Sequence, residues 1–365
     1  MIIKSVEISD YRNYKNATLE LSPLTTVFYG QNGHGKTSAL EAIYYCGLGH
    51  SYKGTNDSDI IRFGAQEAHL KLIAEQDGIP HRIDVHLKKG ARKGIAIDGI
   101  ILKRAVELLG FMHVVLFSPE DMAIVKSSPQ ERRNFLDTEL CQLDKIYTTN
   151  LINYNHLLGQ KNKLLKQIED NPSLADTLSV WNEQLISYGT PIIEKRAAFI
   201  KELSEIMKPI HSSITGGTED IDIIYDPSSE AGEYRSRVLS HEKAEIASHT
   251  SLIGPHRDDM QFLINGIDVR KFGSQGQQRT AALSLKLAEI ELVKKKTGQL
   301  PILLLDDVLS ELDEGRQKRL LDSISGIQTV ITCTGLDDFV LHSFHINKTF
   351  LIEDGQVVCE DKGKG

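Results

Sequence analysis

The chain has 365 residues, and its 42 basic and 50 acidic side chains give a formal net charge of −8 at pH 7. Forty per cent of the residues are apolar and 25% are charged, which are the proportions of a globular protein. No apolar run approaches the ~18 residues that span a bilayer, so disordered, collagen-like and membrane-embedded classes are excluded. The length corresponds to two or three domains, or to one large α/β domain with an insertion.

The N-terminus and the cysteines favour a cytoplasmic protein. The first residues carry no long apolar stretch, so we expect no secretory signal. Four cysteines, at positions 46, 141, 333 and 359, lack C-x-x-C spacing, which argues against a disulfide framework, a zinc site or a redox pair. The negative net charge argues against indiscriminate coating of nucleic acid, although 42 basic residues suffice for one basic face.

In chain order, the first 120 residues combine strand patterns with one strong helix pattern. Apolar residues recur at helical spacing over 37–46. Extended segments are predicted at 4–8, 24–29, 69–74, 81–87 and 113–117.

The pattern becomes helical from residue 128. Ser128-Pro129-Gln130-Glu131 reads as a capping box with proline at the first helical position. Apolar residues then recur at three-to-four spacing to about 207, with a break near Asn171-Pro172, and Gly216-Gly217 closes the segment. We predict a small helical subdomain here.

Strand character returns in the last third of the chain. The short apolar run 302–305 is typical of a parallel strand buried on both faces. The remaining predicted elements are strands at 220–225, 260–264 and 328–332, a helix over 278–296, and a hairpin over 350–358 that turns at Asp354-Gly355. The sequence thus divides into a first lobe (1–120), a helical insertion (121–250) and a second part of the first lobe (251–365).

A phosphate-binding loop lies between the strand ending at Tyr29 and the first helix. Its sequence fits G-x-x-x-x-G-K-[ST], a pattern in which glycines let backbone N–H groups close on phosphates and the helix N-terminus adds positive partial charge. Lys36 would reach the β- and γ-phosphates, and Thr37 would ligate Mg²⁺. The predicted nucleotide-binding set is Gly30, Gln31, Asn32, Gly33, His34, Gly35, Lys36, Thr37 and Ser38.

Two carboxylates follow the apolar run that ends at Leu305. We expect a parallel strand beside the phosphate-loop strand to place Asp306 opposite Thr37 across the metal. Asp307 comes next and is the candidate for holding the attacking water, which makes Asp307 and Lys36 the predicted catalytic pair. The alternative is that the two aspartates simply end a strand.

A small-polar turn opens into the helix predicted over 278–296. Ser274, Gly276 and Gln277 offer a hydroxyl, a glycine for close approach and a helix N-terminus, which together suit a second anion site. The same residues also suit an ordinary polar helix cap, and the sequence leaves both readings open.

Several clusters of basic residues are candidates for DNA contact. The first comprises Lys88, Lys89, Arg92, Lys93, Lys103 and Arg104, around a predicted β-turn. Others lie at Lys161, Lys163 and Lys166 and at 294–296. Each could equally be a solvated face, and no base-reading motif accompanies them, so any DNA recognition is expected to depend on the backbone and on salt.

These motifs resemble those of ABC/SMC-type ATPase heads, and most closely those of the RecF family. The resemblance runs nearly end to end and is carried by residues 8–14, the phosphate loop, 118–121, 254–259, 274–279 and 305–313. It implies an α/β fold, namely an ABC-type P-loop ATPase head of mixed sheet and helices with an inserted, mostly helical lobe.

The resemblance also implies an activity. Two copies would dimerise head-to-tail around ATP and Mg²⁺, with Ser274, Gly276 and Gln277 of one copy closing on the γ-phosphate held by the other and Asp313 lining the seam. It implies an ATP-dependent DNA-binding protein of recombinational repair and fork maintenance. Such a protein would be a weak, DNA-stimulated ATPase that binds duplexes and single/double-strand junctions, aids recombinase loading with RecR and RecO, and supports the SOS response.

The sequence departs from the motifs of transporter ATPases in three ways, which bear on the alternative functions. The signature turn reads 273–277 as G-S-Q-G-Q, Asp307 stands where transporters carry Glu, and no switch His follows the predicted strand 328–332. Hydrolysis is therefore expected to be slow, and the γ-phosphate sensor is left between Thr332, Thr334 and His256. The nucleotide-binding subunit of an ABC transporter is the alternative function. The missing switch His, the residues 117–121 in the region where transporters carry a Gln, and the opening Arg12-Asn13-Tyr14 disfavour it. A purely structural head that binds ATP without useful turnover is the third.

Overall fold

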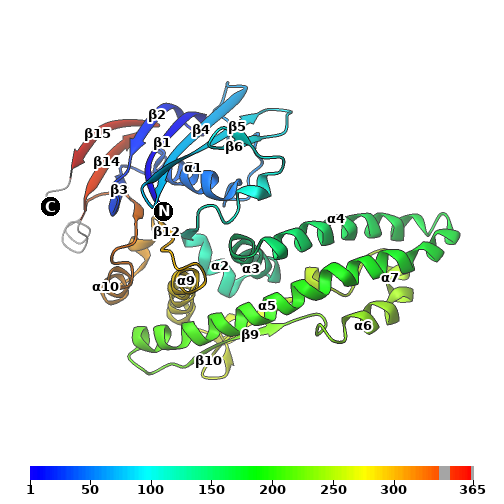
Figure 1. The fold of residues 1–365 in the computed structure, drawn as a ribbon. Coiled ribbons are helices and arrows are strands. Elements are labelled where there is room, and N and C mark those ends of the chain that lie inside the picture. Colours follow the sequence, from blue (N-terminus) through cyan, green and yellow to red (C-terminus); the bar gives the residue numbers. More distant parts are fainter. Residues whose placement is uncertain (337–345, 363–365) are drawn as a thin grey trace. The chain divides into compact units, whose positions relative to one another are not determined.

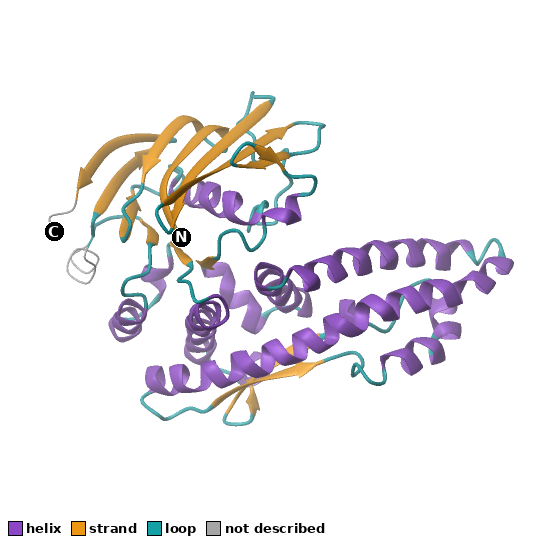
Figure 2. Cartoon of the chain, in the orientation of Figure 1, coloured by secondary structure: helices purple, strands orange, loops and turns teal. Residues whose placement is uncertain are grey.

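The computed structural model describes residues 1–336 and 346–362, which form two compact units. The first unit comprises Met1–Asp121 and Glu289–Gly365, and the second comprises Met122–Ala288. Figures 1 and 2 show the mixed strands and helices of the first unit and the mainly helical second unit. The second unit ends at 288, beyond the expected 250, because the strands at 221–226 and 259–264 pair with each other and the first of them contacts its longest helix.

An antiparallel sheet forms one layer of the first unit, in the order β2-β1-β4-β5-β6-β7. Apolar and polar residues alternate along its strands, so one face is buried and the other is exposed to solvent. The strands are β1 (Ile2–Tyr11), β2 (Tyr14–Glu20), β4 (Glu67–Gln76), β5 (Ile79–Lys88), β6 (Gly94–Ile97) and β7 (Ile100–Ile101).

The second layer of this unit is a mostly parallel sheet, in the order β15-β14-β3-β13-β12-β8. All neighbours from β14 to β8 are parallel, and β15 closes an antiparallel hairpin with β14. The strands are β3 (Thr25–Tyr29), β8 (Val114–Phe117), β12 (Ile302–Asp306), β13 (Thr329–Cys333), β14 (Lys348–Glu353) and β15 (Gln356–Lys362).

The predicted neighbourhood of the phosphate-loop strand is wrong in one respect. β12 is buried along its whole length as predicted, but β13 lies between it and β3. Both β12 and β13 are short apolar runs that suit a central parallel strand, so their sequences do not reveal which one pairs with β3.

Helix α1 (Lys36–Leu48) contacts strands of both sheets, and nearly all of its residues after Ser38 are buried. It begins directly after the phosphate loop, so the core of this unit holds the loop's helical end in place. The other helical segments here are η1 (Ala105–Leu108), η2 (Pro119–Asp121), η5 (Val308–Glu311) and α10 (Glu314–Ser323).

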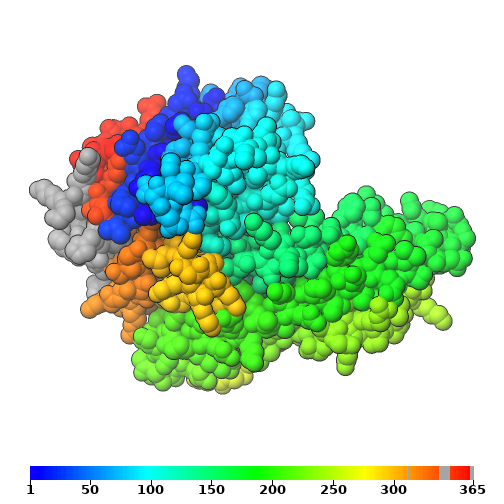
Figure 3. Space-filling model, in the orientation of Figure 1, coloured from blue at the N-terminus to red at the C-terminus, as the bar shows by residue number. Residues whose placement is uncertain are grey.

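The second unit is an elongated, mainly helical body (Figures 1 and 3). Its longest helix, α5 (Leu178–Thr215), would measure ~57 Å at the usual rise per residue and contacts α4 (Lys145–Gln167). The other elements are α2 (Met122–Lys126), α3 (Pro129–Leu143), η3 (Pro172–Thr177), β9 (Ile221–Asp226), α6 (Tyr234–Ser240), α7 (Glu242–Ser248), η4 (Pro255–Arg257), β10 (Asp259–Ile264), β11 (Ile267–Asp268) and α8 (Val269–Phe272).

The boundaries of the helical segment follow the sequence signals, with one difference. The chain breaks at η3 near Asn171-Pro172, and Gly216 ends α5 with a positive φ of 65°. Ser128 precedes Pro129 at the start of α3 as predicted, but its side chain makes no capping hydrogen bond. The proline, which needs no N–H partner at this position, is what begins the helix.

Helix α9 (Gln275–Thr297) runs from the end of the second unit into the first. It starts at the predicted polar turn and is followed after four residues by β12. Within the described ranges, no helix combines the length and the apolar character needed to cross a bilayer.

Candidate nucleotide-binding site

The phosphate loop turns between β3 and α1 with three glycines at positive φ. Gly30, Gly33 and Gly35 have φ values of 143°, 82° and 112°. A Cβ on Gly30 would lie 2.4 Å from the Ile352 carbonyl oxygen of β14, so only glycine fits there. The loop is thus packed against the hairpin that the sequence predicted near the C-terminus.

Hydrogen bonds from β1–β2 and the C-terminal hairpin fix the outside of the loop. Tyr14 donates its hydroxyl to the Gly35 carbonyl (3.0 Å), and the His34 carbonyl accepts from Asn13 Nδ2 (3.0 Å) and Gly355 N–H (2.9 Å). Because the N–H of a peptide unit points opposite to its carbonyl, these bonds turn the N–H groups of Gly35 and Lys36 to the other side of the loop. That is the orientation an anion requires.

Lys36 and Thr37 begin α1 with their polar atoms inside the loop region. Lys36 is buried, and its Nζ donates to the carbonyls of Gly30 (2.9 Å) and Gln31 (3.0 Å). The Thr37 hydroxyl donates to Asp306 Oδ1 (2.8 Å). Two residues 269 positions apart in the chain therefore meet at the predicted metal position.

Asp306 has two further partners. Tyr52 donates its hydroxyl to Asp306 Oδ2 (2.7 Å), and Thr332 of β13 donates to Oδ1 (2.8 Å). Burial, reinforced by the charge of Asp306, raises the pKa of Tyr52, so this hydroxyl stays a donor. Tyr52 escaped the sequence analysis because it lies in an irregular segment after α1 and belongs to no motif.

Asp307 follows the strand with a left-handed φ of 52°. Its N–H donates to Thr332 Oγ1 (2.9 Å), which holds the turn against β13. Burial raises the pKa of Asp307, the nearby charge of Lys36 opposes that rise, and Asp306 adds to it. A carboxylate with a raised pKa beside the metal-ligand candidate suits proton transfer.

An ion pair and a hollow lie beside the phosphate loop. Arg12 Nε and Nη2 donate to both carboxylate oxygens of the buried Glu41 on α1, at 2.7 Å each. A hollow of about 640 Å³ opens beside Arg12. Its other lining residues are Asn13, Gly33, Ser38, Ser58, Asp59, Ile61, Phe63 and Lys89.

The polar turn before α9 is a reciprocal helix cap. Ser274 Oγ accepts from Gln277 N–H (3.2 Å), and Ser274 N–H donates to Gln277 Oε1 (2.9 Å). Gln277 Nε2 also donates to Glu219 (3.0 Å). Ser274 and Gly276 are exposed, so capping and presentation to an outside ligand are compatible at this turn.

Asp313 caps α10. Its carboxylate accepts from the Arg316 N–H (3.0 Å) and pairs with the Arg316 guanidinium, and these contacts, the backbone bond first, lower its pKa. The side chain is exposed, and its lowered pKa keeps it ionised at pH 7.

Some of the basic residues predicted to contact DNA are exposed, whereas others are buried in contacts within the chain. Lys88, Lys89, Arg92, Lys103 and Arg104 are exposed, with Arg104 beside Glu107 (3.6 Å). Lys93 is half-buried instead, and its Nζ contacts the Gly49 carbonyl (2.7 Å) and Asp57 (3.1 Å). Lys161 is fully buried in an ion pair with Glu245 (2.5 Å), which removes it from any solvent-facing cluster.

The three candidate sensors of the γ-phosphate lie in different surroundings. Thr332 contacts both Asp306 and Asp307, whereas the Thr334 side chain makes no hydrogen bond to a residue that the structure describes. His256 belongs to the second unit, where its ring contacts Tyr154 (2.7 Å) and the Ser251 carbonyl (3.1 Å). Burial lowers the pKa of His256 to about 4, so it is neutral at pH 7.

Comparisons of sequence agree with this geometry. The family model described as RecF/RecN/SMC N terminal domain matches residues 2–343. A DNA replication and repair protein RecF from Lachnoclostridium phytofermentans is 53% identical, covering 98% of this chain and 99% of its own. One from Agathobacter rectalis is 50% identical, covering 99% and 100%.

Comparisons of structure give the same result. A solved structure described as the recombination mediator protein RecF-ATP in the RecFOR pathway superposes with a TM-score of 0.90 at 33% identity, covering 99% of this chain and 97% of that one. The head domain of an Smc protein from Pyrococcus furiosus matches with a TM-score of 0.57 at 16% identity, which shows the fold alone. The predicted ABC-type α/β head with an inserted helical part is confirmed.

Proposed function

This chain belongs to the RecF family, and from that premise we propose that it is an ATP-dependent DNA-binding protein of recombinational repair and replication-fork maintenance. The relatives carry the description of DNA replication and repair proteins, and one solved relative is described with ATP. ATP is therefore the nucleotide we propose for the phosphate loop.

The contact between Thr37 and Asp306 carries this proposal. A hydroxyl at the start of α1 and a carboxylate at the end of β12 meet at 2.8 Å, beside a loop whose glycines accommodate close approach. Hydroxyl and carboxylate oxygens are what Mg²⁺ prefers in such sites, so the donor set fits that ion. Bound Mg²⁺ would neutralise phosphate charge.

The residues of this chain then have distinct roles. The N–H groups of the loop would bind phosphate oxygens, and Lys36 would exchange its loop carbonyls for the β- and γ-phosphates. Asp307 would accept the proton of the attacking water. The hollow beside Arg12 is large enough for the base and sugar.

A second copy would complete the site. The exposed turn of Ser274 and Gly276 presents a helix N-terminus, which favours a phosphate, and Asp313 lies exposed at the start of α10. We propose that this turn closes on the γ-phosphate held by a partner copy, so ATP joins the dimer and slow hydrolysis releases it.

DNA and other proteins are the partners in this proposal. The exposed basic residues around the β5–β6 turn would contact phosphates of duplex DNA and of single/double-strand junctions, and DNA would stimulate a weak ATPase. RecO and RecR are proposed as protein partners because a solved relative is described within the RecFOR pathway. The proposal places this work, with recombinase loading and SOS induction, in the cytoplasm.

Sedimentation velocity with Mg²⁺-ATP, with and without duplex DNA, tests the proposal. We expect ATP to convert the wild-type protein to a dimer and Lys36→Ala to stay monomeric. Ser274→Asp keeps a good helix cap but adds a negative charge facing the γ-phosphate, so it should bind ATP in its own loop and fail to dimerise.

Ser236→Asp is the matched control, because Ser236 is an exposed residue of α6 away from the turn. It should dimerise as the wild type does. If ATP leaves the wild type monomeric and duplex DNA changes neither binding nor turnover, the proposed function is wrong.

A further inference from the structure

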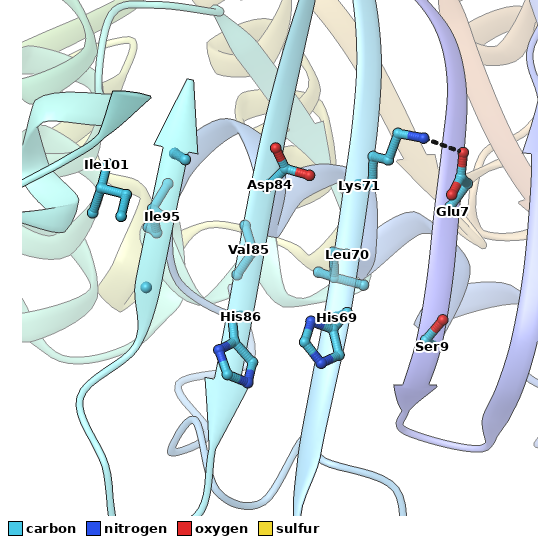
Figure 4. Close-up of a pocket in the computed structure, with 12 residues that line it drawn as sticks. Glu7, Ser9, His69, Leu70, Lys71, Asp84, Val85, His86, Ile95 and Ile101 are labelled. Carbon is cyan, nitrogen blue, oxygen red and sulfur yellow. Dashed lines mark hydrogen bonds and ion pairs between the residues drawn. The ribbon is translucent and has the colours of Figure 1, made fainter. Parts of the chain in front are cut away.

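Three potential metal ligands share the solvent-facing side of the antiparallel sheet in the first unit. His69 on β4 lies directly opposite His86 on β5 in the ladder. Glu67 precedes His69 by two residues and so lies on the same face. Figure 4 shows the two imidazole rings side by side on neighbouring strands.

The donor atoms of these side chains converge. Glu67 directs one carboxylate oxygen to each histidine: Oε2 is 3.2 Å from His86 Nε2, and Oε1 is 3.9 Å from His69 Nε2. All three ligand atoms lie within 4.8 Å of one another. Two ligands held by one tetrahedral ion at its usual bond lengths are about 3.4 Å apart, so small side-chain rotations would bring these atoms to the separations of a shared ion.

The stacked rings can reach such an arrangement. Their centroids are 4.4 Å apart and their planes differ by 6°, so the two rings lie stacked face to face. Rotation about χ2, which is a soft torsion in histidine, can turn one nitrogen of each ring toward a shared ion. Both side chains are about half exposed, at 55% and 44%, so the contacts that the rotation disrupts are the stacking of the two rings and the hydrogen bond between His86 and Glu67.

The surroundings leave room beside the ligands. Gly94 lies opposite His86 on the next strand and contributes no side chain. With Ala96 it lines a hollow of about 390 Å³ that also includes Ser9 and Asp84 (Figure 4). The nearby Lys71 is paired with Glu7 at 2.8 Å, so its charge is compensated.

We propose that Glu67, His69 and His86 form a binding site for a divalent transition-metal ion, with Zn²⁺ the best match. Two imidazoles and a carboxylate suit Zn²⁺ and Cu²⁺ far better than Mg²⁺, which prefers oxygen ligands alone. Three protein ligands leave a fourth position for water or an anion on the side of the hollow. This site is separate from the proposed Mg²⁺ position at Thr37 and Asp306, since it lies on the exposed face of the other sheet.

Calorimetric titration of the metal-stripped, nucleotide-free full-length protein with Zn²⁺ alone tests the site. We expect one ion per chain at this site. His69→Ala/His86→Ala should weaken its binding at least tenfold, and Glu67→Gln should weaken it while keeping both imidazoles. Zinc X-ray absorption of the loaded protein should show two imidazoles in the coordination shell at ~2.0–2.1 Å.

The control variant His156→Ala/His241→Ala removes two imidazoles from the second unit and should bind Zn²⁺ as the wild type does. Circular dichroism without metal should be the same for all variants, since the substituted side chains of the site are exposed. Unchanged Zn²⁺ affinity and stoichiometry in the His69→Ala/His86→Ala protein would overturn the proposal, as would an absorption spectrum without imidazole ligands.

Discussion

Asp307 combines a left-handed backbone conformation with a raised pKa. Its φ of 52° places it in the left-handed region, and burial raises its pKa. Asparagine is, like aspartate, one of the few side chains that tolerates this backbone conformation. Asp307→Asn therefore removes the charge and the proton acceptor without disturbing the turn.

For Asp307→Asn, we expect ATP binding to persist while hydrolysis slows by roughly 100-fold or more, the usual contribution of a general base. The ATP-bound dimer should live correspondingly longer. Single-turnover hydrolysis and the dissociation rate of the dimer measure the two effects. Normal hydrolysis with an unchanged dimer lifetime would remove Asp307 from the catalytic role.

Asp307→Asn should also change the free energy of unfolding, in a direction that the raised pKa of Asp307 determines. Because the folded state raises the pKa of Asp307, it holds this proton more tightly than the unfolded chain, whose carboxyl titrates near 3.8. This group's contribution to the free energy of unfolding is thus reduced as pH rises from about 3.8 through the folded pKa. Asp307→Asn should be more stable than the wild type at pH 7, and urea unfolding should show that advantage shrinking at acidic pH.

The sequence predicts the motif residues of the site, but not the residues outside the motifs that contact them. The spacing of the phosphate loop indicates Lys36 and Thr37, and the end of an apolar run indicates Asp306. Nothing local marks Tyr52, because its role comes from a contact 254 residues away. Lys93 looks like its basic neighbours in sequence, and only the fold distinguishes it, by placing its ammonium group 5.3 Å from the centroid of the Tyr45 ring.

At the scale of elements, the loop depends on the hairpin β14–β15 as much as on its own glycines. Gly30 meets the backbone of β14, whereas nothing lies within 4 Å of a Cβ placed on Gly33. Both glycines have positive φ, so the pair separates backbone strain from steric packing.

Gly30→Ala should lower the free energy of unfolding by roughly 3 kcal/mol and abolish ATP binding, because the new methyl group collides with a carbonyl that cannot move freely. Gly33→Ala, the matched control, should lower it by only about 1 kcal/mol, the strain of a left-handed alanine. Urea denaturation and ATP titration measure both. Equal stability losses in the two variants would contradict the packing role of Gly30.

Sequence patterns predict the individual elements well and their arrangement less well. Period and turn residues indicate β12, β13 and the C-terminal hairpin, because burial and the Asp354-Gly355 turn are local properties. The order of strands is set by packing between distant segments. Because β12 and β13 are similar apolar runs, either order of the two would give the same local sequence pattern. The extension of the second unit to Ala288 is missed for the same reason.

For the whole molecule, the net charge of −8 contrasts with a proposed DNA partner. A local basic surface resolves the contrast, since phosphate binding depends on nearby cations and on salt. Lys88, the last residue of β5, and Arg92, in the connection that follows, are exposed and do not line the hollow beside Arg12, so they are the strongest candidates.

Lys88→Ala/Arg92→Ala should weaken duplex binding and reduce the slope of log K against log[salt] by up to about 0.9 for each lost phosphate contact. Lys163→Ala/Lys166→Ala removes the same number of exposed basic side chains from α4 and should leave both quantities unchanged. Fluorescence anisotropy over a salt series measures them. If the α4 variant alone loses affinity, the DNA surface lies on the second unit.

The place of β3 in its sheet has a consequence for biosynthesis. Both of its neighbours, β13 and β14, come from positions 329–353, so a strand made early waits for nearly the full length of translation before it is paired. A nascent or prematurely terminated polypeptide would carry the intact glycine-rich motif yet lack the walls that shape it. We therefore expect only the finished chain to bind nucleotide, which would keep ribosome-bound fragments out of the proposed ATP-dependent dimer.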